Sequence, residues 1–381
     1  MRVAVVGLGL RAGHVLSILK ARMPEMVITG YCDPGPVGLD KLGGEIPAFA
    51  SVEALIDGAG PDLLFVGSPN HMHLAHITAG LNAGLRVFAE KPVVISEDET
   101  FTLAELLQMH GSDRVLVGLV LRYSQHIRDL RASLSAGHLG RVISMEANEH
   151  IAPYHGAFFM RDWRRKSAYS GGFMLEKCCH DLDIYNMVAQ SRPSRVASFG
   201  GRGAFVPDNA AYAAGDAEYT RKASFWEAAD DAFSADGDIV DNQIAILEYE
   251  SGARLAFHTN TNVPDEQRRF CIVGTQGMAE GDFVRGYLNI TDARSRQPRA
   301  RHDYSGSTDL QGAHYGADEM MCADIVDYLR GDMAALPVSV VDALEAGLAA
   351  MAIDRARFGG SVVDLTDTWN RLDTYNLRQS L

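Results

Sequence analysis

Short apolar runs alternate with segments of helical periodicity over the first third of the chain. The expected strands lie at 3–6, 27–32, 63–67, 86–89 and 115–120, and the expected helices near 11–22, 52–58, 71–83 and 97–110. Strands that are apolar almost throughout indicate a parallel sheet that is buried on both faces. Right-handed crossovers then give a doubly wound, Rossmann-type sheet, with a ligand crevice at the carboxyl ends of its strands.

The hydrophobic pattern changes after about residue 121. Polar and apolar positions alternate at 142–148, 197–200, 241–249 and 254–259. This alternation is typical of a largely antiparallel sheet with one open face. We therefore expect an α/β protein with a Rossmann domain over 1–120 and a second α/β domain over 121–381. Within the second domain, 207–237 lacks a clear period and predicts an irregular lid or assembly loop, whereas 340–358 predicts an amphipathic helix.

Composition and charge narrow the class of protein. A length of 381 residues is more than one hydrophobic core usually holds, which agrees with two domains. A formal net charge of −14 argues against nucleic acid and anionic membranes as partners, and no apolar run is long enough to span a bilayer. Five cysteines without C-x-x-C spacing, behind an N-terminus that reads as a strand rather than a leader, favour reduced thiols in the cytoplasm.

The first apolar run leads into a glycine-rich turn with the pattern G-x-G-x-x-A. Gly7 permits the tight turn, Gly9 lets the backbone approach a pyrophosphate, and the small Ala12 lets the next helix pack against the strand. The free N–H groups at the start of that helix, at Leu10 and Arg11, would face the phosphates.

Asp33 ends the second expected strand, 21 residues after Ala12. Its carboxylate could accept hydrogen bonds from the adenosine ribose hydroxyls, and it would repel a 2′-phosphate. The sequence therefore favours NAD over NADP as the cofactor. A glycine-rich turn in an unrelated α/β protein is the alternative.

Polar residues also follow the third expected strand, at the edge of the crevice. Ser68, Asn70 and His73 belong to a turn and helix start that we place beneath the nicotinamide. A metal cluster of His71, His73 and His76 is the alternative. The residues His71 and His73 point to different faces of a helix, however, so only His73 and His76 are neighbours.

The sequence Glu90-Lys91-Pro92 ends the fourth apolar strand. A charged pair is costly to bury at this place without a purpose, and Pro92 fixes the chain direction after Lys91. The Lys91 ammonium would hydrogen-bond a substrate hydroxyl and stabilise the alkoxide that develops during oxidation. An exposed Glu–Lys pair at a strand end is the alternative.

Glu176, His180 and Asp183 share one polar face of a helix expected to begin near Phe173, because they stand at i, i+4 and i+7. A histidine between two carboxylates suits a proton acceptor, since the carboxylates would orient its ring and raise its basicity. Two alternatives stay open. One is a solvated charged face, and the other is a metal site formed by Glu176, Cys179 and His180.

Rings and hydrogen-bond donors gather between Glu149 and Arg165, among them His155, Trp163 and Arg164. This mixture suits a polyhydroxylated ligand, whose apolar faces stack on rings while its hydroxyls form hydrogen bonds. We therefore expect His155 to contact the substrate. An ordinary polar loop is the alternative.

Taken in this order and spacing, the motifs resemble the Gfo/Idh/MocA family of NAD(P)-dependent sugar and polyol oxidoreductases over nearly the whole chain. The resemblance rests on the glycine turn, Ser68-Pro69-Asn70 with His73, Glu90-Lys91-Pro92, Leu121-Arg122-Tyr123, Trp163-Arg164, and the helix that follows Gly171-Gly172. It implies a Rossmann domain followed by an open-faced α/β domain, which often forms homodimers or homotetramers.

The resemblance also implies roles for single residues. Lys91 would lie near the nicotinamide, His180 would be the catalytic acid/base, and Asp183 would face the substrate. Further cofactor contacts would come from Glu90, Arg122, Trp163 and Arg164. Glu176 is a departure, since many dehydrogenases of the family carry Asp four residues before the catalytic histidine.

The leading hypothesis is an NAD-dependent enzyme that transfers a hydride between a sugar, polyol or derivative and nicotinamide. His180 or Lys91 would take the hydroxyl proton, Glu176 would hold His180, and no metal ion is expected. One alternative is a redox-neutral glycoside-cleaving enzyme with recycled NAD. Another is a non-catalytic protein that senses NAD or a sugar on the same fold.

Overall fold

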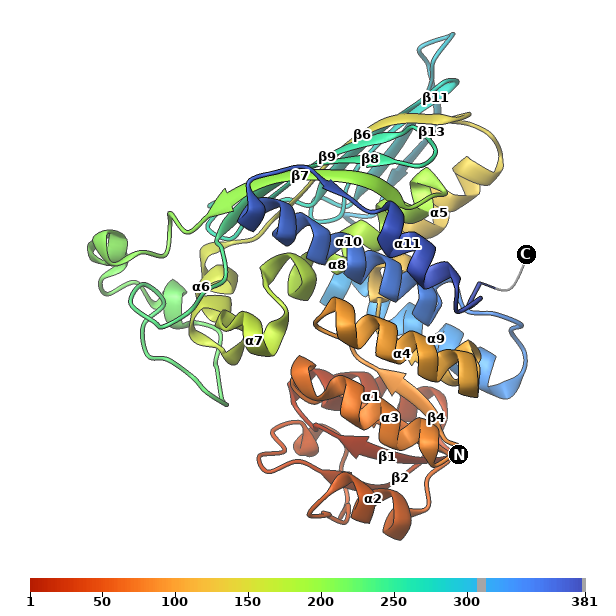
Figure 1. Cartoon of the computed structure of the whole chain (residues 1–381), viewed down its shortest axis with the longest axis vertical. Helices are drawn as coiled ribbons and strands as arrows, with labels where there is room; N and C mark the ends of the chain where they lie inside the picture. The colour runs from red at the N-terminus through yellow and green to blue at the C-terminus, as the bar shows by residue number, and fades with distance from the viewer. Residues whose placement is uncertain (307–312, 379–381) are drawn as a thin grey trace.

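The computed structural model describes residues 1–306 and 313–378. Its N-terminal part contains a five-stranded parallel sheet in the order β2-β1-β3-β4-β5 (Figure 1). The strands are β1 (Arg2–Val6), β2 (Val27–Cys32), β3 (Leu63–Val66), β4 (Arg86–Ala89) and β5 (Val115–Val117). The strand order reverses at β1, between β2 and β3, so a ligand crevice is expected at the carboxyl ends of these strands.

Four helices connect these strands, which confirms the expected Rossmann-type arrangement. They are α1 (Leu10–Arg22), α2 (Val52–Ala59), α3 (His73–Asn82) and α4 (Glu97–His110). The hydroxyls of Ser51 and Ser96 begin α2 and α4 by accepting hydrogen bonds from backbone N–H groups, each over 3.2 Å. The fifth strand is shorter than the expected 115–120, because the chain turns into a 3₁₀ helix, η4 (Val120–Tyr123).

The second sheet has nine strands in the order β13-β12-β11-β10-β6-β9-β8-β7-β14. These are β6 (Val142–His150), β7 (Pro193–Gly201), β8 (Asn242–Tyr249), β9 (Arg254–Asn260), β10 (Arg269–Gly274), β11 (Gly277–Asp282), β12 (Tyr287–Asp292), β13 (Pro298–Asp303) and β14 (Val363–Asp364). Neighbouring strands run antiparallel except β6 and β9, which are parallel. The expectation of a largely antiparallel sheet is confirmed.

Helices cover one face of this sheet and leave the other open (Figure 1). Helix α10 (Val340–Gly359) packs against both α8 (Phe173–Ala189) and β7. On the opposite face, Phe199 and Ile246 are 77% and 60% exposed. The smaller helices are α5 (Gln125–Ser135), α6 (Pro153–Arg161), α7 (Ser167–Ser170) and α11 (Thr366–Asp373), together with the 3₁₀ helices η1 (Leu39–Lys41), η2 (Asn70–Met72), η3 (Ser112–Arg114), η5 (Trp163–Arg165) and η9 (Ala313–Gly316).

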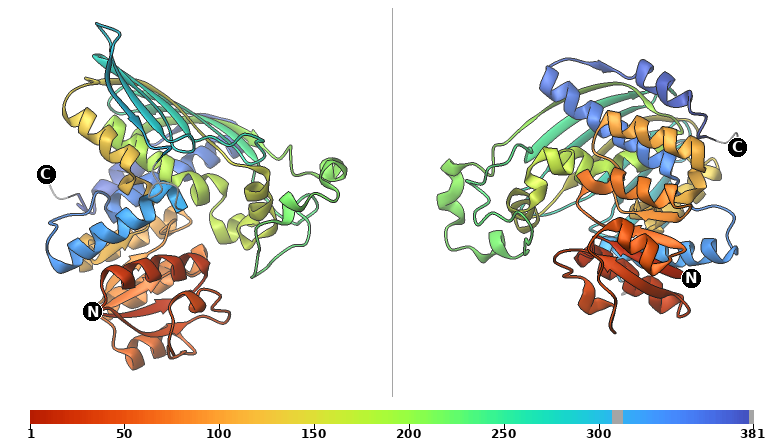
Figure 2. Two further views of the ribbon diagram at one scale, coloured as in Figure 1. Left: turned by 180° about the vertical axis from the view of Figure 1, so that it is seen from behind. Right: turned by 60° about the horizontal axis from the view of Figure 1, so that its bottom comes forward.

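Helix α9 (Ala317–Arg330) comes late in the chain but packs against α1 (Figure 2). At its first turn, Asp318 forms an ion pair with Arg11 over 2.7 Å. The Sγ atom of Cys322 lies 3.8 Å from the carbonyl oxygen of Val15. The C-terminal part of the chain therefore returns to the layer of helices on the first sheet, where His314, shortly before α9, lies within 3.5 Å of Arg11.

Residues 207–237 form a lobe beside α6 and α7 (Figures 1 and 2). Its regular structure consists of two 3₁₀ helices, η6 (Pro207–Ala213) and η7 (Ala217–Thr220), of which η7 packs against α6. This confirms the irregular insertion expected from the sequence. The contacts with α6 bring the insertion next to the expected active crevice rather than to the open face of the sheet.

Candidate active site

The glycine turn between β1 and α1 has the geometry of a phosphate cradle. Gly7 has a φ of +78°, and a Cβ at this position would overlap the backbone nitrogen of Ser68. By contrast, a Cβ at Gly9 would project into open space, so the missing side chain leaves room beside the first turn of α1. Gly9 supplies no side-chain cap to α1, and the N–H groups of that turn are available to an anion.

Asp33 lies at the end of β2, beside this turn. Its Oδ2 accepts a hydrogen bond from the N–H of Leu8 over 2.6 Å, and its Oδ1 accepts one from Gly35 over 2.7 Å. Each carboxylate oxygen has a further lone pair. The carboxylate is thus fixed where a ribose bound along the turn could donate to it, and the residues present fit a dinucleotide.

The side chain of Arg11 is engaged within the protein, although its backbone opens the helix. Its guanidinium pairs with Glu90 over 3.1 Å and with Asp318 over 2.7 Å. His314, just before α9, lies within 3.5 Å of the same guanidinium. Arg11 and Glu90 therefore link the cradle to β4 and α9, and any contact of Arg11 with a cofactor would be through its backbone or after these pairs break.

The segment after β3 is largely structural. His73 is 1% exposed, and its two ring nitrogens face the carbonyl oxygens of Pro92 and Ser68, each at 2.8 Å. The Ser68 hydroxyl lies 2.9 Å from His76 Nδ1, and burial lowers the pKa of His76 to about 4. His73 thus ties together the turns that follow β3 and β4, and the side chains of Asn70 and His71 reach the second domain.

Lys91, Glu176, Asn70 and Arg164 form one buried polar cluster at the carboxyl end of β4. Lys91 Nζ donates to the backbone carbonyl of Glu176 over 2.6 Å and to Glu176 Oε1 over 3.2 Å. The carboxylate also accepts from Asn70 Nδ2 over 2.5 Å and from Arg164 Nε over 2.8 Å. Burial alone would raise the pKa of Glu176, but Lys91 and Arg164 hold it below its usual range.

His180 lies one turn beyond Glu176 on α8 and is 4% exposed. Within residues 1–306 and 313–378 its ring makes no hydrogen bond, and its Nδ1 atom is fully buried. Burial holds the pKa of His180 well below its usual range, and the charges of Lys91 and Arg268 act in the same direction. The expectation that Glu176 holds His180 and raises its basicity is wrong, because Glu176 is committed to Lys91, Arg164 and Asn70.

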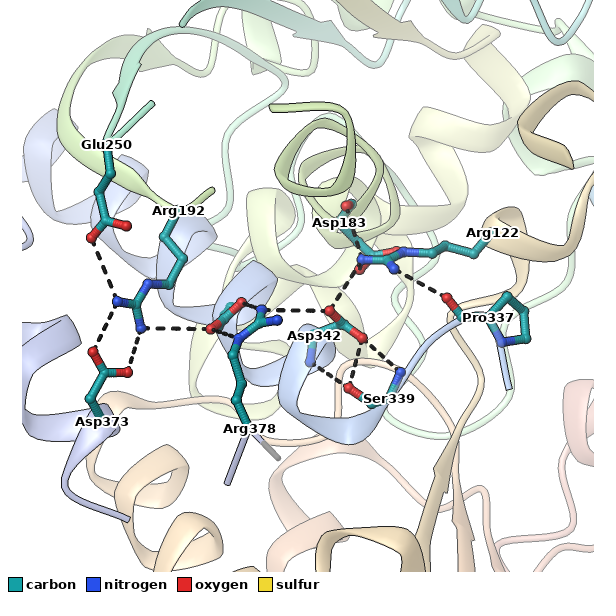
Figure 3. Close-up of polar contacts among 10 residues, drawn as sticks. Arg122, Asp183, Arg192, Glu250, Pro337, Ser339, Asp342, Asp373 and Arg378 are labelled. Carbon is teal, nitrogen blue, oxygen red and sulfur yellow. Dashed lines mark hydrogen bonds and ion pairs between the residues drawn. The ribbon is translucent and has the colours of Figure 1, made fainter. Parts of the chain in front are cut away.

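Asp183 and Arg122 pair with each other (Figure 3). Both carboxylate oxygens of Asp183 accept from the Arg122 guanidinium over 2.7 Å, and Asp183 is 1% exposed. Arg122 also donates to the carbonyl of Pro337 over 3.2 Å and pairs with Asp342 of α10 over 3.4 Å. The pair therefore joins η4 to α8 and α10. Both carboxylate oxygens of Asp183 and the Arg122 guanidinium thus already have partners within the protein, and the expected contacts of Asp183 with the substrate and of Arg122 with the cofactor stay predictions.

Trp163 and Arg164 lie at the cluster, as two neighbours on η5. The Arg164 guanidinium stands 4.2 Å above the Trp163 ring and pairs with Asp162 over 2.7 Å. His155, on α6, stacks against Phe159 with ring centroids 5.3 Å apart. Burial lowers the pKa of His155 well below its usual value, as do the charges of Lys177 and Lys222. His155 is thus a neutral ring within reach of these two lysines.

Sequence reasoning missed several charged residues at the site. Lys177 pairs with Glu149 over 2.9 Å, and the buried Arg268 bridges Glu149 and Asp181 over 2.9 and 2.6 Å. Of these four residues, Lys177 and Asp181 lie on α8, Glu149 lies on β6, and Arg268 directly precedes β10. Lys177 and Asp181 stand beside His180 in the sequence and could have been weighed with it. Arg268 carried no local signal, because its role depends on which strand lies under α8.

His314 is a further residue that sequence reasoning missed. It has a left-handed backbone, with a φ of 52°, and its ring centroid lies 6.0 Å from that of His180. Its Nδ1 faces Asp318 Oδ2 at 3.1 Å. Burial lowers the pKa of His314, so two neutral imidazoles from distant parts of the chain face the same space.

The alternatives that involve metals find no geometric support in the described part of the chain. There, no group of three or more His, Cys, Asp or Glu side chains is arranged to hold a metal ion. In particular, burial raises the pKa of Cys179 to about 12, which keeps the thiol protonated rather than ready to coordinate. Residues 1–306 and 313–378 also contain no helix that is long and apolar enough to cross a membrane.

Comparisons with known proteins find similar sequences over half of the chain or more. The chain is 24% identical over 349 residues to the Bacillus subtilis protein YteT, a match that covers 78% of this chain and 81% of YteT. It is 22% identical over 195 residues to inositol 2-dehydrogenase of Corynebacterium glutamicum, which covers 50% of this chain and 55% of that enzyme. The dehydrogenase match thus spans about half of each chain.

The fold is shared with solved structures over almost the whole chain. A structure of levoglucosan dehydrogenase in complex with NADH and levoglucosan superposes with a TM-score of 0.76 at 16% identity, and the match covers 96% of this chain and 99% of that one. Residues 1–119 match the oxidoreductase family with an NAD-binding Rossmann fold, and residues 127–280 match the GFO/IDH/MocA C-terminal domain. With both domains matched in this order, the chain belongs to the Gfo/Idh/MocA family of oxidoreductases.

Proposed function

We propose that this protein is an NAD-dependent dehydrogenase that oxidises a CH–OH group of a sugar, polyol or derivative, with Lys91 and His180 handling the hydroxyl and its proton. One observation carries the proposal. Lys91, at the end of a Rossmann strand, donates to the backbone of α8 one turn before His180, and its charge acts to lower the pKa of His180 although the two residues are far apart in sequence. The relatives named inositol 2-dehydrogenase and levoglucosan dehydrogenase support the substrate class.

Lys91 is suited to stabilise negative charge on the substrate oxygen. Its side chain is 19% exposed, and its ammonium has three N–H donors, of which the Glu176 carbonyl and carboxylate use two. The third is free to donate to a substrate hydroxyl. As the hydroxyl becomes an alkoxide, this charge-assisted hydrogen bond strengthens, and the bond to Glu176 holds the ammonium in place.

His180 is suited to accept the hydroxyl proton because it is neutral. Burial and the nearby Lys91 keep its pKa low, and a neutral imidazole has a free nitrogen lone pair. A low pKa also makes it a weak base. The positive charge of Lys91, however, also lowers the pKa of a substrate hydroxyl bound beside it. The pKa values of the proton donor, the hydroxyl, and of the proton acceptor, His180, are therefore both lowered.

The first domain would hold the dinucleotide. The backbone of Gly9 and the first turn of α1 would bind the pyrophosphate, and Asp33 would accept from the adenosine ribose. When it is bound there, NAD supplies the hydride acceptor. Ser68, Asn70 and His73 would fix the shape of the crevice beneath it, with Asn70 linking that wall to Glu176.

The experiment is a panel of sugars and polyols, incubated with the purified protein and NAD and followed by absorbance at the NADH band. The proposal requires that at least one member yields stoichiometric NADH. Cleavage of a glycoside without net NADH would favour the redox-neutral alternative. Binding of NAD and a sugar without any turnover, together with unchanged binding in Lys91→Ala and His180→Ala, would favour a sensing protein.

We further propose that residues 121–381 form the substrate-binding and assembly domain, and that the protein is a homodimer or homotetramer. The open face of the nine-stranded sheet exposes Phe199, Ile244 and Ile246, which form an apolar strip across β7 and β8. Sedimentation of wild-type protein and Ile246→Lys tests this, since a lysine there should shift the wild-type oligomer toward monomer.

We also propose that the protein is cytoplasmic. All five cysteines are free, which supports this location, and cell fractionation tests it.

A further inference from the structure

The insertion over 207–237 is fastened to the wall of the active site. Arg161 on α6 donates from Nη2 to the carbonyl of Lys222 over 2.7 Å, and Ala229 donates from its N–H to the carbonyl of Arg161 over 2.8 Å. Arg165 donates to the carbonyl of Glu227 and pairs with Asp236 over 3.0 Å. These contacts fix the backbone at Lys222 and in the segment that follows it.

An aromatic contact extends the insertion across the crevice. Trp226 lies 5.2 Å from Tyr169 on α7 and 6.0 Å from His71 on η2, measured between ring centroids. It also lies 6.2 Å from Trp163. The insertion therefore touches both the Rossmann domain and the second domain, through a residue four positions after Lys222.

The side chain of Lys222 points inward along α6. Its Nζ stands 4.1 Å from the ring centroid of Phe158, and the Arg164 guanidinium stands 5.6 Å from the same ring. Burial lowers the pKa of Lys222 to about 8, and the charges of Lys177, Arg164 and Lys91 act in the same direction while Asp162 opposes them. Lys222 thus belongs to the cluster of cations around the proposed substrate space.

Lys222 differs from the other cations of this cluster because it has no counterion. Lys91 pairs with Glu176, Arg164 pairs with Glu176 and Asp162, and Lys177 pairs with Glu149. Within the described ranges, Lys222 Nζ makes no hydrogen bond or ion pair with any residue. A half-buried ammonium without an anionic partner is costly, so the site holds one positive charge that a ligand can neutralise.

We propose that Lys222 binds a carboxylate of the substrate, so that the dehydrogenase acts on a polyhydroxylated acid, such as a uronic or aldonic acid, rather than on a neutral sugar. This inference rests on the proposed function. A carboxylate carries the single charge that the cluster lacks, and an ammonium on a flexible stem pairs with it as a point charge. Lys91 would stabilise the negative charge on the reacting hydroxyl oxygen, and His180 would accept its proton. Lys222 would orient the substrate by binding its carboxylate away from these two residues.

The test compares matched substrates that differ in one group. The wild-type protein with NAD is assayed on D-glucose, D-glucuronate, D-gluconate and D-glucose 6-phosphate. We expect kcat/KM for a carboxylate to exceed that for the neutral sugar by at least about tenfold, as befits a hydrogen bond between charged groups. A preference for the phosphate, or equal rates on neutral and acidic substrates, would overturn the assignment of a carboxylate.

Variants then assign the preference to Lys222. Lys222→Met keeps the stem over Phe158 and should lose about 10- to 100-fold in kcat/KM on the acid alone. Lys222→Arg keeps the positive charge and should retain most of the wild-type kcat/KM on the acid. Arg221→Met is the matched control, because Arg221 is the neighbouring cation on the insertion and stacks on Tyr154 at 4.3 Å without contacting the cluster. An equal loss in Arg221→Met, or none in Lys222→Met, would overturn the inference.

Calorimetry separates this inference from the proposed function. If no compound yields NADH, the proposed dehydrogenase function fails, but binding of D-gluconate and D-glucuronate to the NADH-loaded protein still tests Lys222. Binding that Lys222→Met abolishes would support the carboxylate site. Binding that is unchanged in Lys222→Met, or no binding to the wild-type protein, would overturn it.

Discussion

Replacing Glu176 with Gln tests the polar cluster most directly. The buried carboxylate accepts from Asn70, Lys91 and Arg164, at 2.5, 3.2 and 2.8 Å. All three partners are donors. The Gln amide can offer them one oxygen, and its NH₂ group must face a donor. The substitution therefore removes a charge and also creates a hydrogen-bond mismatch in the protein interior.

The expected loss of stability is large because the partners stay buried. Removing one member of a buried ion pair costs about 3–5 kcal/mol. Arg164 keeps its ion pair with a second carboxylate, that of Asp162, over 2.7 Å. We therefore expect a loss in the free energy of unfolding at the lower end of this range, about 3 kcal/mol. Lys91 loses its side-chain anchor, and a misplacement of about 1 Å lowers kcat/KM by roughly 10²-fold. From the sequence alone the effect would be mild, since Gln keeps the length and one oxygen of Glu176.

The assay is urea unfolding of Glu176→Gln and wild-type protein, with kcat/KM measured on the same preparations. Glu25→Gln is the control. Glu25 is 55% exposed and pairs with Arg330 over 2.7 Å, where water replaces the lost contact, so the stability and activity of this variant should barely change. Wild-type stability and turnover in Glu176→Gln would refute the view that this carboxylate anchors Lys91.

Four further predictions follow from the site. Lys91→Ala and His180→Ala should each lower kcat by roughly 10²–10⁴-fold while calorimetry still detects NAD binding, and near-wild-type turnover by both would remove their proposed roles. Because the pKa of His180 is low, kcat/KM for oxidation should be level through neutral pH and should fall only in acid, as the imidazole gains a proton; a midpoint at or above the ordinary value of 6.5 would contradict this. For an acidic substrate kcat/KM should also fall as the pH rises through about 8, where Lys222 loses its charge, and the same fall on a neutral substrate would point to another group. Asp33→Ala should narrow the preference for NAD over NADP in titrations of both dinucleotides, chiefly by weakening NAD, and tighter NADP binding by the wild-type protein would show that Asp33 does not select the cofactor.

The local pattern of the chain was sufficient for the elements that carry the first half of the site. Buried strands, helical periods and the G-x-G-x-x-A turn depend on neighbours a few residues apart, so β1 to β4 and α1 to α4 lie close to their expected ranges. The same holds for α8, whose polar face follows from helical spacing. Strands β10 to β13 are less regular in sequence, and the expectations for the second sheet did not reach them.

Partner choice could not be worked out from the sequence. Glu176 and His180 share a helix face, which suggested that they pair. The fold instead brings Lys91 to Glu176 across 85 residues and Arg268 to Asp181 across 87. Asp183 is taken by Arg122, 61 residues away. A buried carboxylate pairs with whichever cation the packing brings to it, because both groups lose water at the same time.

The sequence by itself determined the fold class, the position of the glycine turn, and the two residues, Lys91 and His180, around which the proposed chemistry is built. The tertiary structure decided how these residues are tuned: which carboxylate holds Lys91, why His180 is neutral, and why Lys222 of the insertion enters the site without a counterion. The physical reason is how far apart in the sequence the interacting residues lie. Secondary structure follows from contacts within about one helical turn or between alternate strand positions, whereas charge pairing and burial depend on side chains that only the packed chain brings together.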